Sequence, residues 1–357
     1  MTGWSARATI LALAMLLSGC STLGFYAQAV RGHLDLMTRA RPIAEVVADP
    51  ATPDELKVRL DLALRIRAFA SRELGLPDND SYRRYADLDR PAVVWNVFAA
   101  GEFSVEPRQW CFPVAGCVAY RGYFDREQAE RHAERLRREE DLQTWVGPVP
   151  AYSTLGWFDD PLLNTFIRWP EAELARLIFH ELAHQLLYVP GDTQFNESFA
   201  VAVELDGVRR WMRAANTPAA GEAYARTLAR REAFFTNLLA HRARLGALYR
   251  TRLAPEAMRE RRAELERDAL RDYQAFRERW GSEGKPFDGF DRWFGTGPNN
   301  AQLASVALYN QWVPAFEALR ERDGGDHSAF YAAVRRVAAL PRAERDAMLA
   351  KLAPALP

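Results

Sequence analysis

Apolar residues recur at helical spacing over most of this chain, and the pattern predicts its main elements. Helices are expected within residues 26–76, with breaks at Pro42 and at Asp49-Pro50. Long amphipathic helices with charged faces are expected between residues 221 and 280, and two short helices after residue 326. A succession of amphipathic helices is typical of a bundle, so we expect a helical C-terminal region.

The periodicity changes between residues 89 and 152, where Val, Thr and aromatic residues are bounded by Gly and Pro. This composition predicts strands, which are expected to cover residues 91–100, 117–124 and 142–154. A charged helix is expected between the last two strands, at residues 125–140. The chain is therefore predicted to be α+β and predominantly α-helical, with a small sheet ahead of the next helix.

That next helix, residues 171–188, carries apolar side chains around most of its circumference, which predicts a helix buried in a domain. It follows Pro170, a residue that is tolerated in the first turn of a helix. Its few interior polar residues include His180, Glu181 and His184. Burial of two imidazoles and a carboxylate without partners would be costly, so we expect a metal ion to bind there.

These residues form the motif His-Glu-x-x-His, the signature of zinc metallopeptidases. Residues four apart lie on one face of a helix about one turn apart, so the imidazoles of His180 and His184 can bind one metal ion. Glu181 points away from that position and does not share it. From there its carboxylate can act as general base toward a water molecule. The motif alone also arises by chance, so the flanking sequence matters.

A second helix is predicted from Phe195 onward, after a turn built on residues 190–192. Such a turn would return the chain antiparallel to the first helix and place Glu197 opposite the two histidines. We therefore expect Glu197 to be the third ligand of a Zn²⁺ ion whose fourth position is left for water. Glu204, on the same face as Glu197, either orients a ligand histidine through its second ring nitrogen or is an ordinary surface carboxylate.

Length and composition remove one class of partner. The chain has 357 residues, 48% of them hydrophobic and 26% charged, which is typical of one large globular domain or two small ones. Its 47 basic and 47 acidic residues give a formal net charge of zero. A neutral chain gives no electrostatic reason to bind nucleic acid, and we expect no nucleic acid partner.

Residues 1–19 are predicted to be an export signal, with Arg7 ahead of an apolar run that is too short to span a bilayer comfortably. The sequence Leu17-Ser18-Gly19-Cys20 resembles a bacterial lipobox, which implies that Cys20 is acylated and becomes the mature N-terminus. Ser21 after it favours the outer membrane, by analogy with bacterial sorting. We therefore expect a lipid anchor at the outer membrane, facing the periplasm; a plain signal or a buried N-terminal helix is the alternative.

Several residues of types that can bind metals lie outside the motif. In the oxidising compartment that export implies, Cys111 and Cys117 are expected to form a disulfide because they are close in sequence. A zinc site is not favoured there, since the spacing is not Cys-x-x-Cys and no histidine flanks the pair. The isolated histidines are expected to be surface or packing residues, with His132 on a solvated helix face; they are His33, His132 and His241.

The sequence resembles the gluzincin group of zinc peptidases, whose third ligand is a Glu on a following helix. It is more closely similar to the bacterial putative aminopeptidase family of predicted lipoproteins, over nearly the whole mature chain. The segments that carry this resemblance are YSTLGWF, IFHELAHQ, GDTQFNESFAVAVE and WCFPVAGCVAYRGYF. One departure is the short interval between His184 and Glu197, which leaves no room for a further helix or hairpin between them.

The resemblance implies a zincin-like core, a peptide substrate and zinc-dependent aminopeptidase activity, with an edge strand of the small sheet binding extended substrate. By the same analogy Tyr309 is the preferred donor to the oxyanion, ahead of Tyr152, which packing at a strand end would also explain. An aminopeptidase must also bind the substrate amine, for which Glu102 is the candidate, with an ordinary surface carboxylate as the alternative. Residues 151–164 are expected to form the rim of the cleft.

The predicted regions are the signal (1–19), an N-terminal helical region (20–90), the catalytic core (91–216) and a C-terminal helical region (217–357).

Two other functions stay open at this stage. An endopeptidase of the cell envelope would use the same metal residues without an amine site. A non-catalytic zinc-binding lipoprotein would bind metal and hydrolyse nothing. Glu181 argues against the second, because a purely structural site has no use for a base and usually has four protein ligands, whereas three are found here.

Overall fold

The computed structural model describes residues 24–353, except residues 113–115, 216–217, 283–284, 296, 311 and 323. Side chains are also not described at residues 218 and 307–310. The expected export signal and the expected acylation site, Cys20, lie outside the described residues.

The first part of the described chain is helical, as the apolar pattern predicts. Residues 24–39 form one helix, followed by α2 (Ile43–Ala48) and α3 (Asp54–Leu74). The first turn of α3 contains Asp54 and Glu55, and acidic side chains stabilise the N-terminal end of a helix. The buried face of α3 packs against the helix that carries the His-Glu-x-x-His motif.

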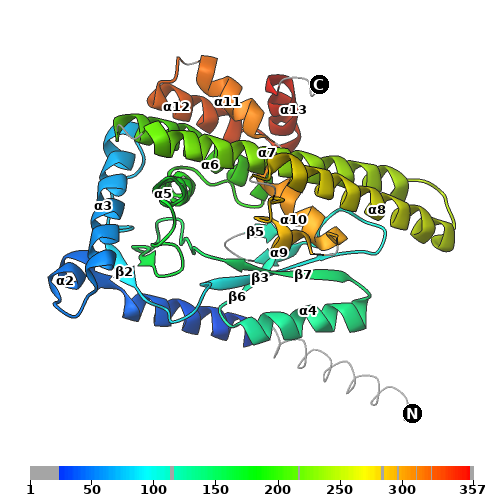
Figure 1. The fold of residues 1–357 in the computed structure, drawn as a ribbon, viewed down its shortest axis with the longest axis horizontal. Coiled ribbons are helices and arrows are strands. Elements are labelled where there is room, and N and C mark those ends of the chain that lie inside the picture. Colours follow the sequence, from blue (N-terminus) through cyan, green and yellow to red (C-terminus); the bar gives the residue numbers. More distant parts are fainter. Residues whose placement is uncertain are drawn as a thin grey trace, which may run out of the picture.

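A three-stranded antiparallel sheet has the order β6-β3-β7. The central strand β3 (Val94–Ala100) pairs with β6 (Arg121–Tyr123) and along its full length with β7 (Gln143–Val149). The charged helix predicted between the last two strands is α4 (Arg126–Glu140), which lies below the sheet in Figure 1.

The two faces of this sheet are covered by different helices because side chains alternate along β3. The face toward α4 contributes Trp95, Val97 and Ala99 to a cluster with apolar residues of α4. On the opposite face, Phe98 and Ala100 pack with Ala301 of α10 (Asn300–Asn310). The sheet is therefore buried on both faces, although it has only three strands.

A second small sheet joins distant parts of the chain. Its middle strand β2 (Arg84–Ala86) pairs antiparallel with β1 (Arg41–Pro42) and parallel with β8 (Leu162–Leu163). This pairing ties the N-terminal helices to the segment that leads into the motif helix.

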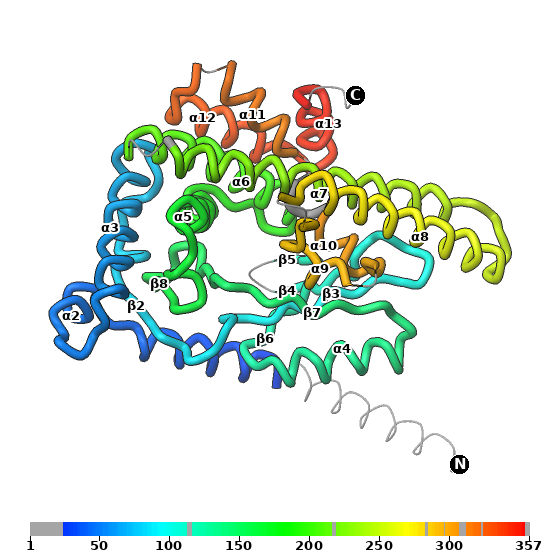
Figure 2. The backbone as a smooth tube through the Cα atoms, in the orientation of Figure 1, coloured from blue at the N-terminus to red at the C-terminus, as the bar shows by residue number. Residues whose placement is uncertain are grey.

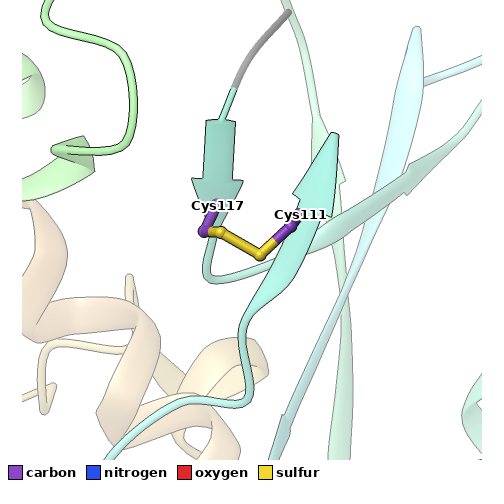
Figure 3. Close-up of a disulfide and its surroundings, with 2 residues drawn as sticks. All are labelled: Cys111 and Cys117. Atoms are coloured by element: carbon purple, nitrogen blue, oxygen red, sulfur yellow. A yellow bond between two sulfur atoms is a disulfide. The ribbon is translucent and has the colours of Figure 1, made fainter. Parts of the chain in front are cut away.

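A hairpin of β4 (Trp110–Phe112) and β5 (Gly116–Val118) holds the two cysteines. Cys111 lies directly opposite Cys117 in this pairing, and the two are joined by a disulfide (Figure 3). The predicted disulfide is thus confirmed.

The two motif helices pack against each other in the interior, and their axes cross instead of lying antiparallel as expected from the sequence. Helix α5 (Glu171–Leu186) is seen end-on in Figures 1 and 2, with α6 (Thr193–Ala214) crossing above it and α3 beside it. A Cβ atom on Gly207 of α6 would lie 2.7 Å from a ring carbon of Phe179 in α5, so the helices could not approach this closely with another residue there.

The remaining helices lie beyond α6 and to one side of the two motif helices (Figure 1). They are α7 (Pro218–Tyr249), α8 (Pro255–Trp280), α9 (Asp291–Phe294), α10, α11 (Val313–Arg322), α12 (His327–Ala338) and α13 (Arg342–Leu352). The antiparallel pair α7 and α8 extends to one side and packs through an aromatic cluster with α9. Helices α11 to α13 cover the outer side of α6.

The described chain is α+β and predominantly helical, as predicted. Its largest hydrophobic cluster takes residues from Leu36 to Leu349, so the predicted N-terminal, core and C-terminal regions share one interior. Within the described ranges, none of the helices combines the length and the apolar character that crossing a bilayer would require.

The expectation for His132 is wrong, because its side chain is buried between α4 and the sheet rather than solvated. Its ring lies 5.6 Å from the ring of Tyr123, and burial together with nearby arginines lowers its pKa to about 4. His241 is also buried, in α7. Both are packing residues, and neither belongs to the site described next.

Candidate metal centre

Helix α5 and helix α6 bring three of the predicted side chains together. Ligand atoms of His180, His184 and Glu197 all lie within 4.8 Å of one another. The Nε2 atoms of the two histidines are 3.1 Å apart, and Oε2 of Glu197 lies 3.2 Å from Nε2 of His180 and 3.7 Å from Nε2 of His184. Two imidazole nitrogens and a carboxylate converging on one point form the donor set of a catalytic zinc site.

The turn between the helices places Glu197 by specific hydrogen bonds. The side chain of Asn196 accepts from the backbone N–H of Val189 at 2.7 Å and donates to the carbonyl of the same residue at 2.8 Å. Asp192 caps α6 by accepting from the backbone N–H of Phe195. Because these three bonds involve residues within about one helical turn of Glu197, they fix its position along α6.

A buried chain of charges supports one of the imidazoles. Nδ1 of His180 lies 2.9 Å from Oε2 of Glu204, so its Nε2 atom is directed at the cluster. Arg176 binds Glu204 at 3.1 Å and Glu173 at 2.7 Å, and Arg231 of α7 lies 3.5 Å from Glu173. Of the two roles expected for Glu204, the contact with His180 matches the first; its carboxylate is 1% exposed and is not a surface group.

The charges in the site favour a cation at the position of the cluster. Burial disfavours the charged imidazolium of His180, but its hydrogen bonds to Glu197 and Glu204 and their negative charges outweigh this effect and raise its pKa to about 10. Burial likewise disfavours the carboxylate of Glu197, yet the two histidines lower its pKa to about 2. A divalent cation would provide the positive charge that these carboxylates stabilise, so the residues present fit a metal ion.

Glu181 follows the first histidine and lies outside the ligand set. Burial raises the pKa of its carboxyl group, and the charges of His180 and His184 lessen this rise. A carboxylate with a raised pKa is a stronger base than a solvated one. Glu181 is therefore the group in this cluster that is suited to accept a proton.

Tyr82 and Asp160 form a polar layer near Glu181. Tyr82 is 1% exposed, has a left-handed backbone with φ of 65°, and donates its backbone N–H to the carbonyl of Asp160. Its hydroxyl forms no hydrogen bond within the described part of the chain, and after burial the charge of Glu181 is the main cause that raises its pKa. A residue other than glycine in a left-handed conformation is strained, and such residues cluster at functional sites.

Two tyrosines near the cluster were not predicted from the sequence. Burial raises the pKa of Tyr120, and the negative charge of Glu197 raises it further, as do Tyr188 and Glu181. The ring of Tyr188 lies 6.3 Å from that of His184, and its pKa is raised by burial and by Glu197. Tyr188 could have been found, because it is four residues after His184; Tyr120 gives no local signal.

The disulfide hairpin places Tyr120. A Cβ atom on Gly116 would lie 2.8 Å from the backbone nitrogen of Gly191, so the hairpin contacts the turn between α5 and α6. Gly116 also has a φ of +73°, a left-handed conformation that glycine adopts without strain. Tyr120 follows this hairpin by two residues and is one residue before the start of β6.

Three other predicted residues lie elsewhere or are not described. The ring of Tyr152 packs against Phe124 at 5.2 Å, which matches the packing alternative. The backbone of Tyr309 is part of α10, but its side chain lies outside the described part of the structure. Glu102 forms a bidentate ion pair with Arg259 of α8 at 2.7 and 2.9 Å, so the carboxylate that would bind a substrate amine is already held. Amine binding by Glu102 stays a prediction.

Comparison with known proteins gives one match. A sequence model of the family described as "Putative aminopeptidase" matches residues 24–349, which contain the whole cluster. No curated protein and no solved structure shows a significant match.

Proposed function

The chain belongs to the putative aminopeptidase family, and from this membership and the geometry of the cluster we propose that it is a zinc-dependent peptidase. The observation that carries the proposal is the convergence of His180, His184 and Glu197 within 4.8 Å, next to Glu181, whose pKa is raised. These three side chains would hold Zn²⁺ and leave a position for water and substrate.

The chain's own residues divide the chemistry between them. When bound, Zn²⁺ would supply Lewis acidity toward water and toward the scissile carbonyl. Glu181 accepts the proton of the attacking water on its carboxylate, and it then donates this proton to the nitrogen of the leaving amine. Glu204 and Arg176 hold the ring of His180 in one orientation throughout.

Oxyanion stabilisation is assigned to a tyrosine from the disulfide side of the site. We infer that Tyr120 donates a hydrogen bond to the developing oxyanion, because it follows closely after the hairpin that contacts the turn between α5 and α6, and because burial and the charge of Glu197 keep its hydroxyl protonated by raising its pKa. Tyr188 flanks the site on the α5 side and is the second candidate. Tyr152 is assigned to packing.

The proposal also includes the type of peptidase and its location in the cell. The family description indicates cleavage at the amino end of peptides. The lipobox-like sequence ending at Cys20 supports a lipid anchor in the bacterial envelope, with the site on the periplasmic side.

The test uses a chain that starts at Ser21 and therefore keeps every described residue. The purified protein is expected to bind about one zinc per chain, to release amino acids from free peptides, to leave N-terminally blocked peptides intact and to lose activity to a chelator. An H180A/H184A variant is expected to lose both zinc and activity. Activity that survives complete metal removal, or zinc binding that survives the double substitution, would overturn the proposed site. Cleavage of blocked and free peptides at equal rates would make the protein an endopeptidase.

A further inference from the structure

The helix of residues 24–39 has one face that is not covered by the rest of the protein. Tyr26, Val30 and Leu34 follow each other at helical spacing and are 39, 58 and 56% exposed. Arg31, Asp35 and Thr38 of the same helix lie beside them on this open face. The stripe is one face of an ordered helix and not a frayed end, as the contacts of the opposite face show.

The opposite face is fixed to the sheet and its hairpin. The ring of Phe25 stacks on Phe112 of β4 and contacts Tyr123 of β6. The side chain of Gln28 donates to the carbonyl of Gly122 and accepts from the backbone N–H of Phe124. Because these contacts set the rotation of the helix, they also determine that the apolar stripe points outward.

The loop that contains Trp157 and Phe158 lies next to this apolar stripe. Trp157 is 78% exposed and Phe158 is 53% exposed, and the ring of Phe158 lies 4.6 Å from the ring of His33. His33 is one residue before Leu34 and three after Val30, so the loop lies against the stripe.

This loop is held rigidly. Asp160, which is 1% exposed, accepts from the backbone N–H and the hydroxyl of Thr154, and the hydroxyl of Thr154 in turn accepts from the backbone N–H of Phe158. Leu155 has a left-handed backbone with φ of 56°. The loop is thus fixed in a strained shape that displays two large aromatic side chains to the outside.

We propose that the stripe and the loop together form a bilayer-contacting surface, made of Tyr26, Val30, Leu34, Trp157 and Phe158, whose partner is a glycerophospholipid membrane. Five of the nine exposed large hydrophobic side chains in the described residues lie on it. Single exposed apolar residues need no explanation, but a contiguous group on ordered elements indicates a binding surface.

The position of the surface along the chain argues for a membrane. Tyr26 is six residues after Cys20, so an extended linker keeps it within about 20 Å of an acyl group on that cysteine. Tyr and Trp are the side chains that favour the interface between lipid and water, and the exposed Arg31 beside the stripe suits anionic headgroups. The inference rests on the lipid anchor in the proposed function, and it does not depend on the peptidase chemistry.

The experiment measures how close chosen positions lie to lipid. The full chain is reconstituted in vesicles of phosphatidylethanolamine and phosphatidylglycerol, with a fluorophore on V30C, on W157C or on M348C. Met348 is the matched control, since it is 44% exposed but belongs to α13, across the molecule from the helix of residues 24–39 (Figure 1). The unsubstituted chain reports any labelling of the native cysteines, of which Cys111 and Cys117 are paired.

Spin-labelled lipids are expected to quench the fluorophores at positions 30 and 157 at least three-fold more strongly than the one at position 348. Equal quenching at all three positions would overturn the proposal, even if the chain is anchored and active. Two further results, measured on a chain that starts at Ser21, would also contradict the proposal. A dimer that V30S and W157S abolish in solution would assign the surface to a second copy. A KM for soluble peptides that W157S raises several-fold would assign the loop to the substrate cleft.

Discussion

Arg345 of α13 donates two hydrogen bonds, at 2.6 and 2.9 Å, to one carboxylate oxygen of Asp192 in the turn between the two motif helices. Both side chains are almost fully buried, and Asp192 is also the residue that caps α6. The last helix of the chain therefore fixes the turn that brings Glu197 to the histidines. This contact spans 153 residues of sequence.

Substitution of Arg345 by Leu is expected to lower the free energy of unfolding by about 3 kcal/mol, because Asp192 would remain buried without its cation. Urea unfolding measures this change. The double variant R345L/D192N should lose less than R345L alone, since it leaves no unpaired charge. If the two variants are equally stable, the pair does not act as a buried ion pair.

The variant E181Q is expected to bind zinc as the natural chain does and to lose about 100-fold or more in kcat, because a neutral amide cannot accept the proton of the attacking water. Metal analysis and peptide assays on the same sample separate the two effects. E127Q is the control, because the side chain of Glu127 is 83% exposed on α4. Unchanged turnover in E181Q would refute its assignment as base.

Glu204 and Arg176 are expected to affect metal binding and not to take part in proton transfer. E204Q should weaken zinc binding by about 10-fold to 100-fold, because residues that orient a metal-binding imidazole have effects of this size. R176M should weaken it by about 10-fold, because Glu204 would lose its cation partner. Competition with a chromogenic chelator measures both values, with R131M on the solvent face of α4 as control. Equal zinc affinity in all variants would contradict the support role.

Tyr120 is expected to act in the transition state. Y120F should lower kcat by about 100-fold with little change in KM or thermal stability, because a phenyl ring keeps the packing but cannot donate to the oxyanion. Y188F and Y152F are the comparison variants in the same peptide assay. A large loss in Y188F, or in Y309F, with normal activity in Y120F would move the role to that tyrosine.

His241 is expected to make the fold sensitive to acid. Burial lowers its pKa to about 4, and Arg244 adds to this effect, so the folded state holds the ring neutral where an unfolded chain, with a pKa of 6.5, binds a proton. Stability that is present above pH 6.5 is therefore lost as the pH falls toward 4, and between pH 7 and pH 5 the loss is about 2 kcal/mol. H241L should lack this part of the pH dependence in urea unfolding at the two pH values. An identical pH dependence in both chains would show that the ring is protonated in the folded state.

The part of the site that could be predicted is the part that local geometry determines. His180 and His184 share a face because four residues make about one helical turn. Glu197 follows a turn whose Pro and Gly are visible in the sequence, and the structure places its carboxylate 3.2 Å from His180. The helices, the main strands and the disulfide were predicted for the same reason, since each depends on residues close together in the chain.

Other features depend on contacts between distant segments. Tyr120 is 77 residues before Glu197, and its position relative to the site depends on the packing of the disulfide hairpin against the turn at Gly191. His132 was expected in solvent because its neighbours are charged, but the sheet covers the face of α4 on which it lies.

The sequence by itself determined the elements, the His-Glu-x-x-His motif and the candidate base, because side-chain spacing along a helix or strand follows from backbone geometry. Tertiary structure alone decided which buried charges meet, as with Arg345 and Asp192, and which apolar face of residues 24–39 remains uncovered. These outcomes depend on the packing of whole elements, and the free energy of that packing is shared among many contacts that no local pattern encodes.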